Sequence, residues 1–147
     1  MKVMLIDDSK TMRNIQRSVL KQIGIDLVEE ACDGQDALSK VGAFAPDLIL
    51  VDWNMPNMDG LSFIKAFRRT DRRTPLIMVT TEAEKSRVID AIKTHEMAIR
   101  SQVLMMLAQQ PEEMLSTPEG KRALQGKIKG IINDILKQKT GYGGVDN

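Results

Sequence analysis

The chain has 147 residues, of which 42% are hydrophobic and 28% charged, and its formal net charge is +1. This length and composition predict one modest core, exclude compositional disorder, and make a single domain the default expectation. The small net charge gives no electrostatic support for binding nucleic acid or an anionic membrane. The only cysteine, Cys32, excludes an intrachain disulfide and a multi-cysteine metal site, and we expect it to be a small buried residue.

Apolar runs remain short throughout the sequence. None approaches the roughly 20 residues that a membrane-spanning helix needs, and no secretory signal is evident. We therefore expect a protein of the reducing cytoplasm that has no membrane span.

Strand-like and helix-like patterns alternate over the first 93 residues. The predicted strands cover residues 3–6, 27–31, 48–52 and 75–79. The intervening helices are predicted from apolar stripes: Met12, Ile15, Val19, Leu20 and Ile23; Ala37, Leu38 and Val41; Leu61, Ile64 and Phe67; Val88, Ile89 and Ile92. Strands separated by helices of this length predict right-handed βαβ units, and hence an α/β fold with four parallel strands.

Polar residues stand at the ends of three predicted strands. Asp7 and Asp8 follow the first strand, Asp52 ends the third, and Thr80 follows the fourth. The carboxyl ends of parallel strands form the ligand crevice of an open sheet, which makes these functional positions. Three carboxylates gathered there would raise one another's pKa values unless a cation joined them, and a hard, oxygen-seeking ion such as Mg²⁺ suits that ligand set.

Each of these residues also has a purely structural interpretation. Asp7, Asp8 or Ser9 could cap the first helix, and Thr80 could simply end its strand. Turn formation alone would account for three residues after Asp52, namely Asn54, Pro56 and Gly60. We favour a functional site because acidic residues end two separate strands.

The acidic pair Asp7–Asp8, the segment from Asp52 to Pro56 with Gly60, and Thr80 resemble the CheY-like receiver domain of two-component response regulators. The resemblance covers residues 1–93 and implies a doubly wound, flavodoxin-like sheet. It also implies that a phosphohistidine kinase donates a phosphoryl group to Asp52. The implied metal ligands for Mg²⁺ are Asp7, Asp8, Asp52 and the backbone carbonyl of Asn54, and Thr80 would bind a phosphate oxygen and switch the following loop.

The sequence departs from a complete receiver domain after Lys93. The family pattern would continue with a fifth strand carrying a Lys-Pro pair, an aromatic switch residue and a fifth helix. Residues 94–107 instead predict a helix that ends at Pro111, with an apolar stripe of Met97, Ile99, Val103, Met106 and Leu107. We therefore predict a truncated sheet of four strands, and the missing lysine implies weaker phosphorylation or weaker coupling to a switch.

Residues 95–147 resemble a second family, the flagellar basal-body protein FliL, on residues 100–107, 111–121 and 144–147. Independently of this resemblance, Thr117 and Pro118 predict the start of another helix, with Leu124, Ile128, Ile131, Ile132 and Ile135 on one face. We therefore interpret the chain as an incomplete receiver domain over residues 1–93 joined to a helical tail over residues 94–147. If the tail packs over the exposed edge strand, the chain forms one compact domain; if it does not, the exposed sheet edge or the apolar helices would favour a homodimer.

Two functions remain open at this point. The first is a phosphoacceptor module of a chemotaxis or motility system, which is not an enzyme acting on an independent substrate. The second is a chimeric or truncated fragment that serves as a structural or interaction module of the flagellar system, with a motor or motility protein as partner. A glycosidase-like use of paired carboxylates lacks an aromatic-lined cleft, since the chain has only five aromatic residues.

Overall fold

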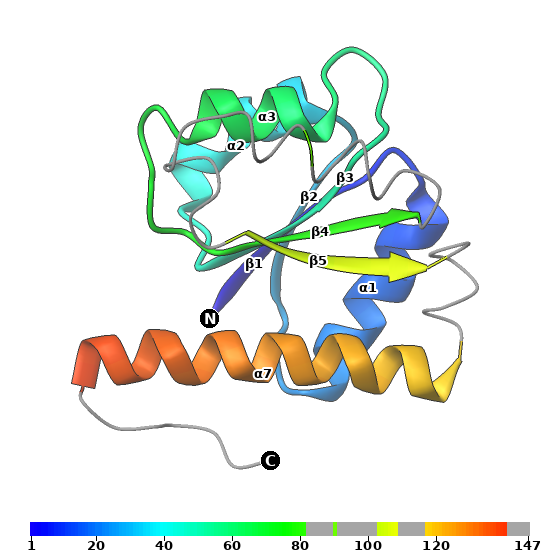
Figure 1. Ribbon diagram of the computed structural model, residues 1–147, viewed down its shortest axis with the longest axis vertical. Coiled ribbons are helices and arrows are strands. Elements are labelled where there is room, and N and C mark those ends of the chain that lie inside the picture. Colours follow the sequence, from blue (N-terminus) through cyan, green and yellow to red (C-terminus); the bar gives the residue numbers. More distant parts are fainter. Residues whose placement is uncertain (82–89, 91–102, 109–116, 141–147) are drawn as a thin grey trace.

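The computed structural model describes residues 1–81, 90, 103–108 and 117–140. The elements in chain order are β1 (Lys2–Ile6), α1 (Lys10–Gln22), β2 (Leu27–Ala31), α2 (Gly34–Phe44), β3 (Leu48–Asp52), α3 (Gly60–Phe67), β4 (Leu76–Thr81), β5 (Val103–Ala108) and α7 (Pro118–Thr140). The first seven confirm the predicted alternation of strands and helices (Figure 1). The helix predicted over residues 82–93, apart from Asp90, and the predicted boundary near residue 93 lie outside the described residues.

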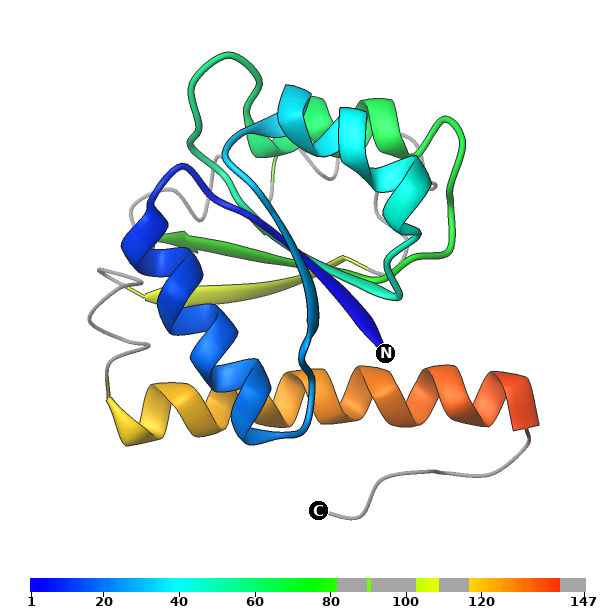
Figure 2. The same cartoon turned by 180° about the vertical axis from the view of Figure 1, so that it is seen from behind.

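All strands pair in parallel, in the order β2-β1-β3-β4-β5. Since side chains alternate between the faces of a strand, β1 places Val3 and Leu5 on one face and Met4 and Ile6 on the other. Helices α1 and α7 cover the first face, and α2 and α3 cover the second (Figures 1 and 2). This arrangement confirms the predicted flavodoxin-like α/β class.

The sheet differs from the prediction at its far edge. Residues 103–108 form β5, which pairs with β4 from Val103 opposite Leu76 to Ala108 opposite Thr81. The predicted helix is therefore wrong for these residues, and the sheet has five strands rather than four. A short, continuously apolar run suits a buried strand and a buried helix equally, and here pairing with β4 decides between them. Because β5 occupies that edge, the open β4 edge that suggested a homodimer does not exist.

Helix α7 confirms the second helix predicted in the carboxyl-terminal part. The side chain of Thr117 caps it by accepting the backbone N–H of Gly120 at 3.0 Å. Leu124, Ile128 and Ile131 are buried in the same core as the α1 side chains. Residues 118–131 therefore pack against the sheet and belong to its hydrophobic core. No helix among the described residues has the length and apolarity required to cross a bilayer.

Strand β2 forms the opposite edge of the sheet, and Cys32 follows its last residue. The prediction that this cysteine is buried is wrong, because its side chain is exposed at the sheet edge. Its backbone N–H donates to the Asp36 carboxylate at 3.1 Å. The cysteine therefore belongs to the polar surface between β2 and α2.

Candidate functional site

Three carboxylates meet at the carboxyl edge of the sheet. Strands β1 and β3 are neighbours in register, with Ile6 opposite Val51, so the residues that follow them lie together. Each of Asp7, Asp8 and Asp52 offers a carboxylate oxygen, and these oxygens all lie within 4.8 Å of one another. We call these three aspartates together the carboxylate group. Asp7 is buried, Asp52 is half-buried and Asp8 is exposed, so the carboxylate group opens to solvent on the side of Asp8.

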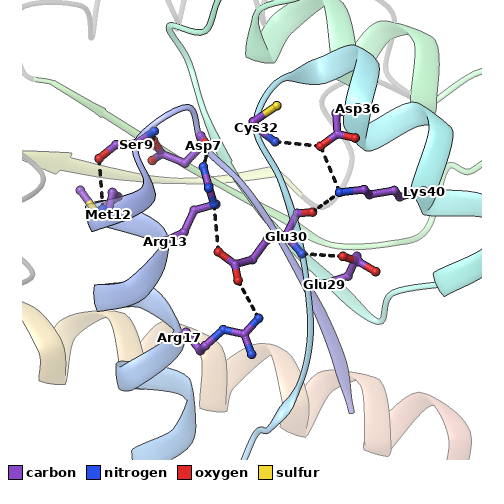
Figure 3. A network of polar contacts seen from close by, with 10 residues as sticks. All are labelled: Asp7, Ser9, Met12, Arg13, Arg17, Glu29, Glu30, Cys32, Asp36 and Lys40. Carbon is purple, nitrogen blue, oxygen red and sulfur yellow. Dashed lines mark hydrogen bonds and ion pairs between the residues drawn. The ribbon is translucent and has the colours of Figure 1, made fainter.

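Asp7 is held in place by backbone and side-chain contacts (Figure 3). Its backbone N–H donates to the carbonyl of Ala31 at 3.1 Å, which extends the pairing of β1 with β2. Its carboxylate accepts the N–H of Ser9 at 2.9 Å, and its carbonyl accepts Arg13 Nη1 at 2.6 Å. Arg13 Nε also donates to Glu30 at 2.9 Å, so one guanidinium links the site to the edge strand.

The first residues after β1 divide the capping and site roles between them. Ser9 is the N-cap of α1, and its hydroxyl accepts the N–H of Met12 at 3.1 Å. The capping interpretation is therefore correct for Ser9. Asp7 and Asp8 do not cap the helix, and their carboxylates lie beside that of Asp52.

Asp52 is fixed by the loop that follows it. The N–H of Gly60 donates to the carbonyl of Trp53 at 3.0 Å and closes the loop between β3 and α3. A side chain at position 60 would overlap the carbonyl oxygen of Asp52, which explains the glycine in physical terms. Asp59 caps α3 by accepting the N–H of Ser62 at 2.8 Å, so α3 begins where the loop after Asp52 closes.

The electrostatics of the group are those of crowded, desolvated acids. Burial, with added repulsion from Asp7 and Asp8, raises the pKa of Asp52 to about 7, although backbone hydrogen bonds from Trp53 and Asn54 oppose this. Burial likewise raises the pKa of Asp7 to about 6; the N–H of Ser9 and the charge of Arg13 oppose this rise, and the charge of Asp8 adds to it. A cation among the three carboxylates would reverse both shifts.

The donor set fits a small divalent cation. Mg²⁺ prefers oxygen ligands at about 2.1 Å, so two ligands on opposite sides of the ion stand roughly 4.2 Å apart. Carboxylate oxygens within 4.8 Å of one another reach that spacing through small side-chain movements. The exposed side at Asp8 leaves room for the water molecules that Mg²⁺ usually keeps.

For two further predicted site residues, Thr80 and Asn54, the structure gives the position of the backbone relative to Asp52. Val79 lies opposite Asp52 in the sheet, and Thr80 is the next residue of β4, so its backbone reaches the same edge as the carboxylates. Asn54 is exposed in the loop two residues beyond Asp52. The roles predicted for the Thr80 hydroxyl and the Asn54 carbonyl stay predictions.

The sequence holds no lysine, arginine or histidine between residues 101 and 120. Strand β5, which ends at Ala108 beside the end of β4, therefore brings no cation to this edge of the sheet. The absence of a counterpart to the family lysine stays a prediction from the sequence. Its expected effects on phosphorylation and coupling stay predictions.

Comparison with known families follows the division seen in the sequence. Residues 3–99 match the family model of the response regulator receiver domain, which is about two thirds of the chain. The chain therefore belongs to the response regulator receiver domain family. Residues 64–147 also match the family model of the flagellar basal body-associated protein FliL, and the two matches overlap over residues 64–99.

Relatives of this chain include chemotaxis proteins. The chain is 44% identical to the chemotaxis protein CheY1 of Helicobacter pylori over 96 residues, which cover 63% of this chain and 77% of that protein. It is 38% identical to the chemotaxis protein CheY of Pseudomonas aeruginosa over 93 residues, covering 62% and 75%.

Solved structures extend the likeness beyond the sequence match. The chemotaxis protein CheY4 of Vibrio cholerae superposes with a TM-score of 0.69 at 27% identity, covering 88% of this chain and 97% of that chain. A Francisella response regulator receiver domain gives 0.67 at 25% identity, covering 95% and 98%. Nearly the whole of each of these two structures is thus matched, although the match to the receiver family model ends at residue 99.

Sequence reasoning missed three residues that support the site. Arg13 was not singled out, because an arginine on an amphipathic helix is ordinarily solvated. Asp33 and Asn57 were not linked, although their side chains are bonded across 24 positions of sequence. Asp33 directly before a helix and Asn57 between Pro56 and Met58 were the available signals, and each by itself predicts only a cap or a turn.

Proposed function

We propose that this chain is a phosphoacceptor module of a two-component chemotaxis or motility system, modified on Asp52 with the help of Mg²⁺. The observation that carries the proposal is the meeting of Asp7, Asp8 and Asp52, with carboxylate oxygens within 4.8 Å, at the carboxyl edge of a receiver sheet. The chemotaxis relatives support the choice of system. A cytoplasmic location and a phosphohistidine kinase as donor belong to the same proposal.

Asp52 is the nucleophile in this mechanism. One carboxylate oxygen attacks the phosphorus of a phosphohistidine or an acyl phosphate, the bond from phosphorus to the donor breaks, and the donor leaves with that electron pair. The product is an aspartyl phosphate, so the chain takes part in one transfer and does not act as an enzyme on an independent substrate. A bound Mg²⁺ would offset charge on the transferring group and keep Asp52 ionised.

The remaining residues hold and orient the reacting groups. Asp7 and Asp8, with the backbone carbonyl of Asn54, would hold the ion beside the Asp52 carboxylate. The raised pKa values of Asp7 and Asp52 support this role, because a cation would offset the burial and repulsion that raise them. Thr80 would donate a hydrogen bond to a phosphate oxygen and draw the following loop inward.

The output differs from that of a typical receiver domain. With no basic residue at the end of β5, the phosphoryl group lacks a charge-assisted contact from that strand. We therefore expect phosphorylation at Asp52 to be coupled weakly to any change in the α7 side of the molecule.

A second function is supported by the FliL match over residues 64–147. In it, the receiver sheet serves as a scaffold, and the carboxyl-terminal part contacts a flagellar motor or motility protein. The two functions differ in one simple respect, because only the first requires a reactive Asp52.

Acetyl phosphate distinguishes the two functions. The full chain is incubated with acetyl phosphate and Mg²⁺, and its intact mass is measured beside that of Asp52→Asn. Asp26→Asn serves as the matched control, because Asp26 is an exposed aspartate outside the carboxylate group. We expect one added phosphoryl group on the wild type and the control, and none on Asp52→Asn or after chelation of the metal. A wild type that gains no phosphoryl mass would remove the first function and leave the second.

A further inference from the structure

The loop between β3 and α3 is tied to a helix that contributes nothing to the carboxylate group. Asn57 Nδ2 donates to Asp33 Oδ2 at 2.8 Å, and Asp33 is the N-cap of α2. The other oxygen of Asp33 accepts the N–H of Asp36 at 2.8 Å. Both oxygens of this buried carboxylate therefore accept hydrogen bonds, one from its own helix and one from the loop that follows Asp52.

A backbone contact strengthens the same junction. The N–H of Gly34 donates to the carbonyl of Met58 at 3.1 Å. A Cβ atom at Gly34 would lie 2.6 Å from Met58 Cγ and 2.9 Å from the Met58 carbonyl oxygen, so the two backbones approach as closely as glycine allows. The start of α2 and the tip of the loop therefore form one tight contact.

Asn57 suits this junction in its backbone as well as its side chain. Its φ of 65° lies in the left-handed region, which asparagine adopts more readily than most residues. At the base of the loop, the hydrogen bond from Gly60 to Trp53 holds the chain beside Asp52. The loop is thus fixed at both its base and its tip.

We propose that Asp33 and Asn57 form a positioning pair for the aspartate site. By fixing the loop, they hold the backbone of Asn54 beside Asp52 before the ion arrives. Because the loop is already ordered, no part of the free energy of ion binding is spent on ordering it. Neither residue touches the ion or the phosphoryl group. This inference rests on the proposed Mg²⁺-dependent function and adds to it two residues that the carboxylate group does not contain.

Exchanging the two side chains separates this role from simple stabilisation. In Asp33→Asn, the helix keeps a capping oxygen, and a weaker hydrogen bond between two neutral amides replaces the bond to the carboxylate. In Asn57→Asp, two carboxylates face each other, and the extra negative charge alone would strengthen cation binding. The double variant Asp33→Asn with Asn57→Asp restores one amide-to-carboxylate hydrogen bond in the reverse direction.

The readouts are the Mg²⁺ dissociation constant, followed through Trp53 fluorescence, and the thermal midpoint of each full-length variant. We expect Asn57→Asp to bind Mg²⁺ about 10-fold more weakly, as is typical when support around a metal ligand is lost, Asp33→Asn to lie between it and the wild type, and the double variant to return close to wild type. Thr117→Ala is the matched control, because it removes the N-cap of α7, a helix that contributes no residue to the carboxylate group. It should lower the thermal midpoint and leave Mg²⁺ binding unchanged.

Three results would overturn or relocate the inference. An Asn57→Asp variant that binds Mg²⁺ like the wild type would overturn it, and so would a folded double variant that stays as weak as Asn57→Asp. If Asn57→Asp does not fold, Asn57→Gly carries the test, because glycine keeps the left-handed backbone and removes only the side-chain amide. A wild type that neither responds to Mg²⁺ nor accepts a phosphoryl group would instead refute the proposed function itself.

Discussion

Gly60 lies directly against the backbone of Asp52, and a Cβ atom at position 60 would overlap the Asp52 carbonyl oxygen and lie 3.2 Å from the Cα of Trp53. We predict that Gly60→Ala lowers the free energy of unfolding by about 1–3 kcal/mol, because the backbone must move to admit the methyl group. It should also weaken Mg²⁺ binding, since that backbone carries Asp52.

Urea denaturation and Mg²⁺ titration of Gly60→Ala measure both effects. Gly42→Ala is the control, because nothing lies within 4 Å of a Cβ atom there and the site is inside α2. Alanine is the better helix former, so this variant should be more stable than wild type by about 1 kcal/mol. Equal stability of the two variants would show that Gly60 is not under steric constraint.

The carboxylate group predicts an unusual dependence of stability on pH. Because the pKa of Asp52 is raised from 3.8 to about 7, the folded protein binds a proton that the unfolded chain has released. In the absence of divalent ions, stability should therefore fall as the pH rises from about 4 to about 7 and then level off. Asp7, with a pKa of about 6, contributes in the lower part of this range.

Asp52→Asn should remove the part of this dependence that belongs to Asp52 and leave the part due to Asp7, whose pKa is raised mainly by burial. At pH 8 without metal, we expect the variant to be more stable than wild type by about 2 kcal/mol, since it lacks a desolvated charge. Mg²⁺ should stabilise the wild type increasingly above pH 7 and the variant much less. Urea midpoints between pH 4 and 8 measure this, and a wild type whose stability rises over that range would contradict the raised pKa.

Arg13 and Arg17 both pair with Glu30, but only Arg13 also contacts Asp7. Arg13→Ala should lower the free energy of unfolding by about 1–3 kcal/mol, because the Asp7 carbonyl and the partly buried Glu30 lose a charged donor. Arg17→Ala should cost less than about 1 kcal/mol, because its ion pair is more exposed. Chemical denaturation compares them, and equal losses would mean that the contact with Asp7 contributes nothing.

Helix α7 packs into the core of the sheet, and we predict that the sheet needs it for stability. Ile128→Ala should lower the free energy of unfolding by about 2–5 kcal/mol, since this fully buried side chain packs beneath α1 and the sheet. Arg122→Ala, on the exposed side of the same helix, should change it little. A single cooperative transition for both variants is expected, whereas an unaffected Ile128→Ala would show that α7 is not needed by the sheet.

The sequence predicts the site's carboxylates well because they stand at the ends of strands. Asp7, Asp8 and Asp52 directly follow or end short apolar runs, and parallel pairing brings such ends to one edge of the sheet. The helix caps at Ser9 and Thr117 are equally local and equally predictable. These features depend on a few neighbouring residues.

Features that depend on pairing between distant residues were missed. Val103–Ala108 is apolar at every position, so its pattern has no period that separates a strand from a helix, and only the partner strand β4 decides. Two side-chain contacts depend on how separate elements pack together, which the local sequence does not encode. They are the hydrogen bond between Asn57 and Asp33 and the contact of Arg13 with the carbonyl of Asp7. The exposed position of Cys32 likewise follows from β2 being an edge strand.

A crystal of the full chain soaked in Mn²⁺ is the most direct test of the shared cation. Mn²⁺ accepts the same carboxylate and carbonyl ligands as Mg²⁺ and is located by its anomalous scattering. We expect one strong peak among the carboxylates of Asp7, Asp8 and Asp52, which disappears in Asp8→Asn. A peak elsewhere, or no peak in a well-ordered site, would contradict the proposal that these three aspartates hold a metal ion for chemistry at Asp52.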